Sequence, residues 1–403
     1  MTKKSHVRVA DLLGAGRLAI DATIGLTSLV ETMHHNILRT PGVFGAKTQQ
    51  PAGGITGLVY KSIRGVTRLV GGGIDAVLGR LVPLFGAAAE SSVQRAAVLA
   101  ALNGVLGDHL QVSSNPLAIT MQWRRDGQAL EPAPAALAAA LPGAGGKLLL
   151  LVHGLCMNDR LWRRNGHDHG AALAVDCGYT PVYLHYNSGL HISTNGRQFA
   201  RQIDALLHAW PVPVERLVIL AHSMGGLVAR SAFHHGDLEG HAWPRRVDKV
   251  VFLGTPHHGA PLERGGNWID AALDASPYTT AFARLGKIRS AGITDLRHGS
   301  MVDADWERRD RFTRSRRPPQ ALPLPAGVAC HAIGAALGKK TGEPLKSFLG
   351  DGLVPLRSAL GVHEVARRTL DFPASRRWVG YGMHHLDLLD NRQVYARIRR
   401  WLR

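Results

Sequence analysis

Ser223 stands where the sequence changes from a strand pattern to a helix pattern. Residues 217–221 form an apolar run of the length of a buried strand, and residues 227–235 follow helical spacing. A serine at so sharp a turn exposes its hydroxyl and places the next backbone N–H groups at a helix N-terminus, where developing negative charge is stabilised. The flanking Ala221 and Gly225 are small enough for strand and helix to approach closely. The stretch therefore predicts a nucleophilic serine.

The segments around this serine alternate between buried strands and helices. Further strands are predicted at residues 147–152, 181–186, 247–253, 328–333 and 377–381, and helices at residues 161–177, 195–210 and 386–402. Before them, residues 117–123 and a turn at Arg125-Asp126-Gly127 predict a hairpin, and residues 131–146 a linker. Buried strands that alternate with helices predict an α/β fold with a mostly parallel, doubly wound sheet.

A serine hydroxyl is a weak nucleophile near neutral pH and needs a base, which an acid orients in turn. In α/β-hydrolases the acid and then the histidine follow the serine, each on a loop after a strand. Asp351 in GDGLVP fits the acid, although a turn aspartate would also suit this position. His384 and His385 both follow the last strand and compete as base. We favour His385, because it directly precedes the closing helix, and assign His384 a supporting role.

An acyl-transfer intermediate carries an oxyanion that two backbone N–H groups should meet. One would belong to Met224, directly after the serine, and the other to Leu155 in the loop behind the strand at 147–152. His153 in that loop and His222 beside the serine are predicted to support the site. The arrangement needs no cofactor.

Two other groups of reactive residues have simpler interpretations. His257 and His258 are adjacent, but without a third ligand at fitting spacing a pocket-lining or structural role is favoured over a metal site. Cys156, Cys177 and Cys330 are few and odd in number, so no disulfide framework follows, which fits a reducing compartment. We therefore predict no metal.

Two domains are expected. Residues 1–112 form an N-terminal amphipathic helical region, and residues 113–403 the catalytic domain. Within the latter, residues 262–325 are Arg-rich and too long for a plain connection, which predicts a lid-like insertion.

The N-terminal region has apolar residues at helical spacing over residues 9–37 and 55–81, and a third helix is expected after Ser91 and Ser92. Its glycine-rich helices carry basic polar positions. They would either lie on a membrane surface or pack as a cap on the catalytic core, and we favour the packing.

The chain of 403 residues has a formal net charge of +18. Such a charge favours contact with anionic surfaces, including a peripheral contact with anionic membranes. No zinc-finger spacing or basic stripe interleaved with aromatics is present, so no nucleic-acid partner is expected. The sequence has no clear signal peptide and no run of membrane-spanning length. We therefore expect a cytoplasmic protein, and peripheral association with a membrane is the alternative.

Five motifs, LLLVHG, AHSMGGLVAR, FLGTPHHGAP, GDGLVP and GMHHLDLL, resemble in this order the α/β-hydrolase serine esterases and lipases. The resemblance is nearest to the PGAP1-like (GPI inositol-deacylase-like) and triacylglycerol-lipase-like branch, and covers roughly residues 115–403. It implies Ser223, Asp351 and His385 as a catalytic triad and Leu155 and Met224 as oxyanion donors. Ala221 replaces the first glycine of the serine motif, and His384 stands where another polar residue is common.

The predicted function is a serine carboxylic-ester hydrolase that acts through an acyl-serine intermediate on lipid-like esters. An acyltransferase with the same triad is one alternative. The other is a non-catalytic lipid-surface-binding protein with a hydrolase-like fold. The sequence leaves the acyl-chain length, the headgroup and the oligomeric state open.

Overall fold

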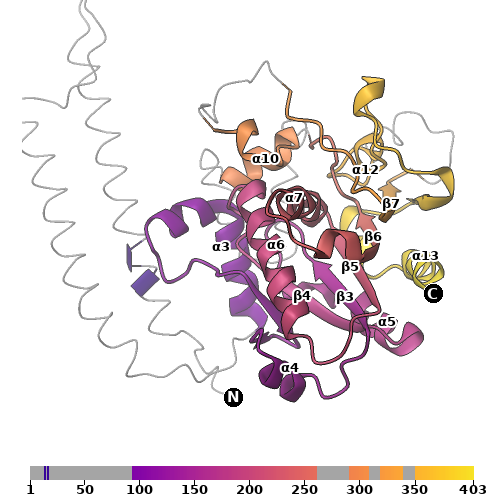
Figure 1. The fold of residues 1–403 in the computed structure, drawn as a ribbon. Helices are drawn as coiled ribbons and strands as arrows, with labels where there is room; N and C mark the ends of the chain where they lie inside the picture. Colours follow the sequence, from indigo (N-terminus) through magenta and orange to yellow (C-terminus); the bar gives the residue numbers. More distant parts are fainter. Residues whose placement is uncertain (1–12, 15, 18–92, 261–289, 308–317, 339–349) are drawn as a thin grey trace, which may run out of the picture. The chain divides into compact units, whose positions relative to one another are not determined.

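The computed structural model describes residues 13–14, 16–17, 93–260, 290–307, 318–338 and 350–403 (Figure 1). The chain divides into two units, Met1–Ser92 with Leu110–Ala118 and Val93–His109 with Ile119–Arg403. In the first unit, the Asn115 side chain donates a 3.0 Å hydrogen bond to the Gly14 carbonyl and thereby ties a helical turn to the segment after Leu110. The second unit contains the sheet and all the predicted site residues.

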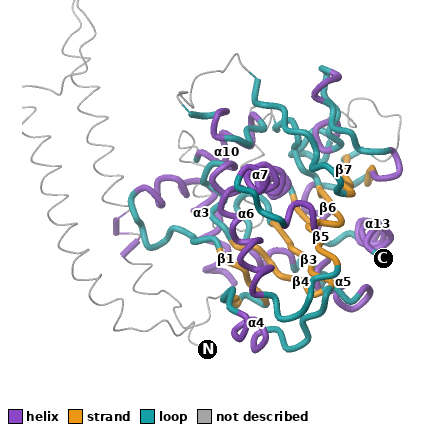
Figure 2. The backbone as a smooth tube through the Cα atoms, in the orientation of Figure 1, coloured by secondary structure: helices purple, strands orange, loops and turns teal. Residues whose placement is uncertain are grey.

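One eight-stranded sheet forms the centre of the second unit (Figure 2). Its strands are β1 (Gln122–Arg125), β2 (Gln128–Leu130), β3 (Lys147–Val152), β4 (Thr180–His185), β5 (Arg216–His222), β6 (Val247–Leu253), β7 (Ala329–Ala336) and β8 (Arg377–Tyr381). Their order is β2-β1-β4-β3-β5-β6-β7-β8, and β3 to β8 are parallel to one another. Only β1 pairs antiparallel, with β2 and with β4. This confirms the predicted fold class.

Helices cover both faces of the sheet (Figure 1). The α-helices are α3 (Val93–Val112), α4 (Pro134–Ala140), α5 (His169–Cys177), α6 (Ile192–Ala209), α7 (Met224–Leu238), α10 (Ala291–His298), α12 (Leu356–Ala359) and α13 (Arg392–Leu402). Short 3₁₀ turns lie at Asp159–Trp162, Trp243–Arg246, Asp303–Asp305, Ala366–Arg368, Ala374–Arg376 and His385–Leu389. The helices α6 and α7 pack together on one face, and α5 and α13 contact each other on the opposite face.

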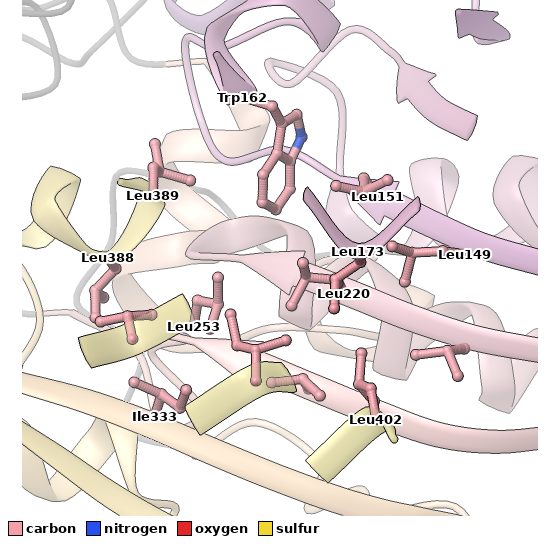
Figure 3. Close-up of a cluster of buried hydrophobic side chains, with 14 of the residues drawn as sticks. Leu149, Leu151, Trp162, Leu173, Leu220, Leu253, Ile333, Leu388, Leu389 and Leu402 are labelled. Atoms are coloured by element: carbon pink, nitrogen blue, oxygen red, sulfur yellow. The ribbon is translucent and has the colours of Figure 1, made fainter. Parts of the chain in front are cut away.

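The core between the sheet and α5 and α13 is built from alternate strand residues (Figure 3). Leu149 and Leu151 of β3, Leu220 of β5 and Leu253 of β6 point to this face and are fully buried. Leu402 of α13 packs against them. Each such leucine contributes roughly 1.5–3 kcal/mol of burial free energy. This packing therefore fixes the positions of the strands and of the loops at their carboxyl ends.

Most of the predicted elements are present, but several boundaries differ. The hairpin forms, although its first strand is β1 rather than residues 117–123. The predicted linker at 131–146 contains the helix α4, which begins on a proline at a helix start and continues through alanines. The closing helix begins at Arg392 rather than at residue 386, because Asn391 caps it by accepting a hydrogen bond from the Gln393 N–H.

The two less regular regions of the sequence lie largely outside the described residues. This applies to the first two predicted N-terminal helices and to most of the predicted lid-like insertion, of which the helix α10 is described. The expected third N-terminal helix corresponds to α3. Among the described helices, none is both long and apolar enough to cross a membrane.

Candidate active site

Ser223 lies at the turn between β5 and α7, and α7 begins at Met224, three residues before the predicted start of the helix pattern. Its φ of 54° and ψ of −127° are strained for a residue with a side chain, and its N–H donates a 2.8 Å hydrogen bond to the Leu253 carbonyl of β6. A Cβ on Gly225 would lie 2.5 Å from the carbonyl oxygens of Val152 and His153. Only glycine therefore lets α7 approach β3 closely enough to hold the strained turn.

Asp351 and His385 form a buried pair at the same end of the sheet. The His385 Nδ1 lies 2.7 Å from Asp351 Oδ2, and the His385 backbone N–H donates to the Asp351 carbonyl at 3.1 Å. The second carboxylate oxygen accepts from the N–H groups of Leu353 and Val354 at 3.0 and 2.8 Å. Asp351 thus closes a turn and also contacts a histidine.

The end of β6 links the serine to this pair. Leu253 accepts the Ser223 N–H, and the following Gly254 packs against the His385 ring, where a Cβ would come within 2.9 Å of Cε1. The His222 and His385 ring centroids are 4.7 Å apart. Ser223 and the Asp351–His385 pair therefore lie at the carboxyl ends of the parallel strands, linked through the end of β6. His384 is exposed, and its N–H donates to Asp387 at 2.8 Å.

The loop after β3 passes directly beside the serine. A Cβ on Gly154 would lie 2.9 Å from Ser223 Cβ, so glycine is required for this approach. The Leu155 N–H makes no hydrogen bond to any described residue. Met224 is the first residue of α7, and its N–H has no acceptor within the helix. Both predicted oxyanion donors thus flank the serine with N–H groups that the helix and loop leave available.

Two buried histidines support this loop and turn as neutral rings. The His153 Nδ1 donates to the Gly154 carbonyl at 2.8 Å, and its ring stacks on Tyr186, whose hydroxyl donates to the His153 carbonyl. Burial lowers the pKa of His153 to about 3, and it lowers the pKa of His222 well below the usual value. Both rings are therefore neutral near neutral pH, and their low pKa makes each of them a weak base.

One buried charged cluster near the loop has no counterpart in the sequence analysis. Asp159 Oδ1 lies 3.3 Å from Arg124 Nη1 of β1 and 3.2 Å from His185 Nδ1 of β4. Burial alone would raise the pKa of Asp159, but His185 and Arg124 outweigh it and lower the pKa. The cluster anchors the segment that follows the predicted oxyanion loop. Its members are far apart in sequence, and no spacing rule connects them.

His257 and His258 lie in the loop after β6, away from the serine turn. The His258 Nε2 lies 3.0 Å from the Gly361 carbonyl, and the N–H groups of both histidines donate to Ser358. Within the described part of the chain, no group of three or more histidine, cysteine or acidic side chains is placed to hold a metal ion. Both side chains line a cavity, a role that the sequence favoured.

One family model matches part of this chain. Residues 144–322 match a family model described as the PGAP1-like alpha/beta domain, a span that includes the serine turn but ends before Asp351 and His385. No curated protein matches the chain.

Solved structures with a similar fold include lipases and an esterase. The mature lipase BlEst2 of Bacillus licheniformis is 17% identical with a TM-score of 0.41, and the match covers 70% of this chain and 98% of that one. The Pyrococcus furiosus esterase Pf2001 is 12% identical with a TM-score of 0.37, over 64% and 82% of the two chains. Aspergillus fumigatus lipase B is 13% identical with a TM-score of 0.36, over 98% and 81%.

Proposed function

We propose that this chain, of which residues 144–322 match a PGAP1-like alpha/beta domain, is an ester hydrolase that cleaves carboxylic esters through an acyl intermediate on Ser223. The match to a PGAP1-like alpha/beta domain over residues 144–322 supports the proposal and includes three of the five sequence motifs. The observation that carries the proposal is the buried Asp351–His385 pair, which lies beside a strained serine at one end of a parallel sheet. The roles of the individual residues are inferred from that arrangement.

In the acylation step, Ser223 Oγ attacks the ester carbonyl carbon and His385 Nε2 accepts the hydroxyl proton. The carboxylate of Asp351 holds the Nδ1–H tautomer and stabilises the imidazolium that forms. The proton then passes to the departing alkoxide, the C–O bond breaks, and an alcohol leaves. In the second step, water loses a proton to His385 and attacks the acyl-serine, which releases the carboxylic acid and restores Ser223.

The negative charge of each tetrahedral intermediate falls on the former carbonyl oxygen. The N–H groups of Leu155 and Met224 are the proposed donors to it. Loss of one such donor typically costs about 10²–10³ in kcat. Because these donors belong to the backbone, their positions depend on Gly154 and Gly225 rather than on any side chain.

Lipid-like esters are the proposed substrates. The support lies in the sequence, where an amphipathic basic N-terminal region and a lid-length insertion accompany the hydrolase motifs. Both regions lie largely outside the described residues, so the substrate class rests on these patterns alone. The proposed setting is at or near an anionic membrane surface.

The test is hydrolysis of p-nitrophenyl esters of increasing acyl length by the wild type and by Ser223→Ala, with and without anionic vesicles. We expect the alanine variant to fall to background, and we expect a fluorophosphonate probe to label the wild type only. Ser375→Ala, at an exposed serine, is the matched control and should remain active. If wild type is inactive on every ester and Ser223 stays unlabelled, a lipid-surface-binding role replaces the catalytic one.

A further inference from the structure

A cavity of about 190 Å³ lies beside the loop after β6. None of the proposed catalytic residues lines it. Its wall includes Arg230 of α7, His257 and His258 of that loop, and His363 and Arg368 from the segment after α12. Among the described residues that line it, there is no aspartate or glutamate. The cavity is therefore basic on several sides.

Arg230 is the central feature of this cavity, because its guanidinium is buried and no carboxylate of the described residues contacts it. The residue is only 3% exposed, and burial lowers its pKa to about 10. The Nη2 donates to the Leu322 carbonyl, and Nη1 lies 3.5 Å from the His257 carbonyl. The Nε has no hydrogen-bond partner among the described residues. Arg230 Nη1 also lies 3.4 Å from His257 Nδ1, and a buried cation in contact with neutral groups is costly unless an anion joins it.

The neighbouring groups supply a second guanidinium and further imidazole rings. Arg368 donates from Nη2 to the Pro319 carbonyl, and the His258 and His363 rings meet edge to face with centroids 4.8 Å apart. His257 Nε2 also lacks a partner within the described residues. Two guanidinium groups and several imidazoles around one small cavity form the donor set that a phosphate group requires.

We propose that this cavity binds a phosphate group, with Arg230 and Arg368 as its principal donors. A neighbouring cavity of about 390 Å³ shares Leu322, Arg368 and Leu370 with it and also contains Arg376, so the rest of a phosphate ester has room. The phosphate can come from free phosphate or from a lipid headgroup, which present the same oxygens. The proposal does not depend on the proposed ester hydrolysis.

The test is calorimetric titration of the full chain at constant ionic strength with two probes, inorganic phosphate and monomeric dihexanoyl phosphatidic acid. We expect saturable binding of at least one probe by the wild type. Arg230→Gln and Arg368→Gln should each weaken it by about tenfold or more, the effect of losing a charge-assisted hydrogen bond. Arg245→Gln, which removes an exposed arginine outside the cavity, should bind as the wild type does.

Each outcome decides the proposal. Binding of both probes, or of one alone, supports it and identifies the source, provided that the two cavity variants weaken it. Equal affinity in wild type, Arg230→Gln and Arg368→Gln would overturn it, as would the absence of saturable binding to either probe. If Arg230→Gln does not fold, Arg368→Gln decides, because that side chain is only partly buried. Ser223→Ala should bind phosphate normally, which separates this result from the test of hydrolysis.

Discussion

The catalytic corner and the basic cavity use buried charge in opposite ways. In the corner, formed by Ser223, Asp351 and His385, the buried carboxylate has its oxygens occupied by His385 and two backbone N–H groups. In the cavity, Arg230 is equally buried but meets only neutral carbonyls and a histidine ring. Since an unpaired buried charge costs several kcal/mol, the first arrangement is complete in itself and the second is completed by a ligand.

The two regions also differ in how much room their backbones leave. Around Ser223, the glycines at 154, 225, 226 and 254 all face atoms that a Cβ would approach within 3 Å. The cavity near Arg230 instead has about 190 Å³ of free space. A site whose geometry must stay fixed is closely packed, whereas a site that receives an extra group keeps space for it. The predictions below test this comparison, from the largest expected effect to the smallest.

The largest effect is expected from Asp351→Asn, which removes the charge of the pair and keeps its shape. The amide no longer favours the Nδ1–H tautomer or stabilises the imidazolium, so we expect kcat to fall by about 10⁴ with KM nearly unchanged. Ester hydrolysis and circular dichroism of the variant measure the loss and the integrity of the fold. Asp237→Asn, at an exposed aspartate of α7, is the matched control. Retained activity in Asp351→Asn would mean that another group orients His385.

The next largest effect concerns the close packing at the serine turn. Gly225→Ala would place a Cβ 2.5 Å from two backbone carbonyl oxygens of β3 and the following loop, which cannot move independently of the sheet. We expect the free energy of unfolding to fall by about 3 kcal/mol, in the range of overpacking, and activity to be lost with it. Urea denaturation measures the first quantity. Gly143→Ala, where no atom lies within 4 Å of the added Cβ, should leave stability and activity unchanged.

The dependence of the free energy of unfolding on acid pH tests whether His153 is neutral in the folded protein. Burial lowers the pKa of His153 to about 3, so the folded state stays unprotonated while the unfolded chain takes up a proton below about pH 6.5. Stability from this residue is therefore fully present above pH 6.5 and is lost as the pH falls towards 3. At pH 4.5 the loss should reach about 2–3 kcal/mol.

The measurement is the free energy of unfolding at pH 7 and at pH 4.5 for the wild type and His153→Gln. The variant should lose less stability between the two pH values than the wild type does. His384→Gln, at an exposed histidine, should keep the wild-type pH dependence. An unchanged pH dependence in His153→Gln would show that His153 takes up a proton in the folded protein.

The three residues proposed for the corner could be selected from local sequence patterns, whereas their surroundings could not. Ser223, Asp351 and His385 each follow a strand on a local turn, so strand pattern, turn residues and chain order locate them without knowledge of distant contacts. The start of α7 was placed too late, because glycines at 225 and 226 obscured a helix that begins directly after the serine. Glycine weakens a helix pattern in sequence, yet here tertiary packing requires it.

The Asp159 cluster and the basic cavity could not be predicted, since their members meet only through the fold. Arg124, Asp159 and His185 come from β1, a 3₁₀ turn and β4. The sequence does mark Arg230 as unusual, because it is the single charged residue in the stretch GGLVARSAF, which otherwise has apolar and small residues. A charge on the buried face of a predicted helix marks a residue that needs a partner, but the sequence does not say which one.

The smallest effect is expected where a charge without a partner is removed. Arg230→Met should change the free energy of unfolding by no more than about 1 kcal/mol in phosphate-free buffer, because the lost hydrogen bonds are offset by relief of the unpaired buried charge. Arg124→Met is the matched contrast. It strips the buried Asp159 of a cationic neighbour and should cost about 2–3 kcal/mol, near the lower range for breaking a buried pair. Equal losses in the two variants would remove the distinction between a paired and an unpaired buried arginine, and with it the reason to expect an anion beside Arg230.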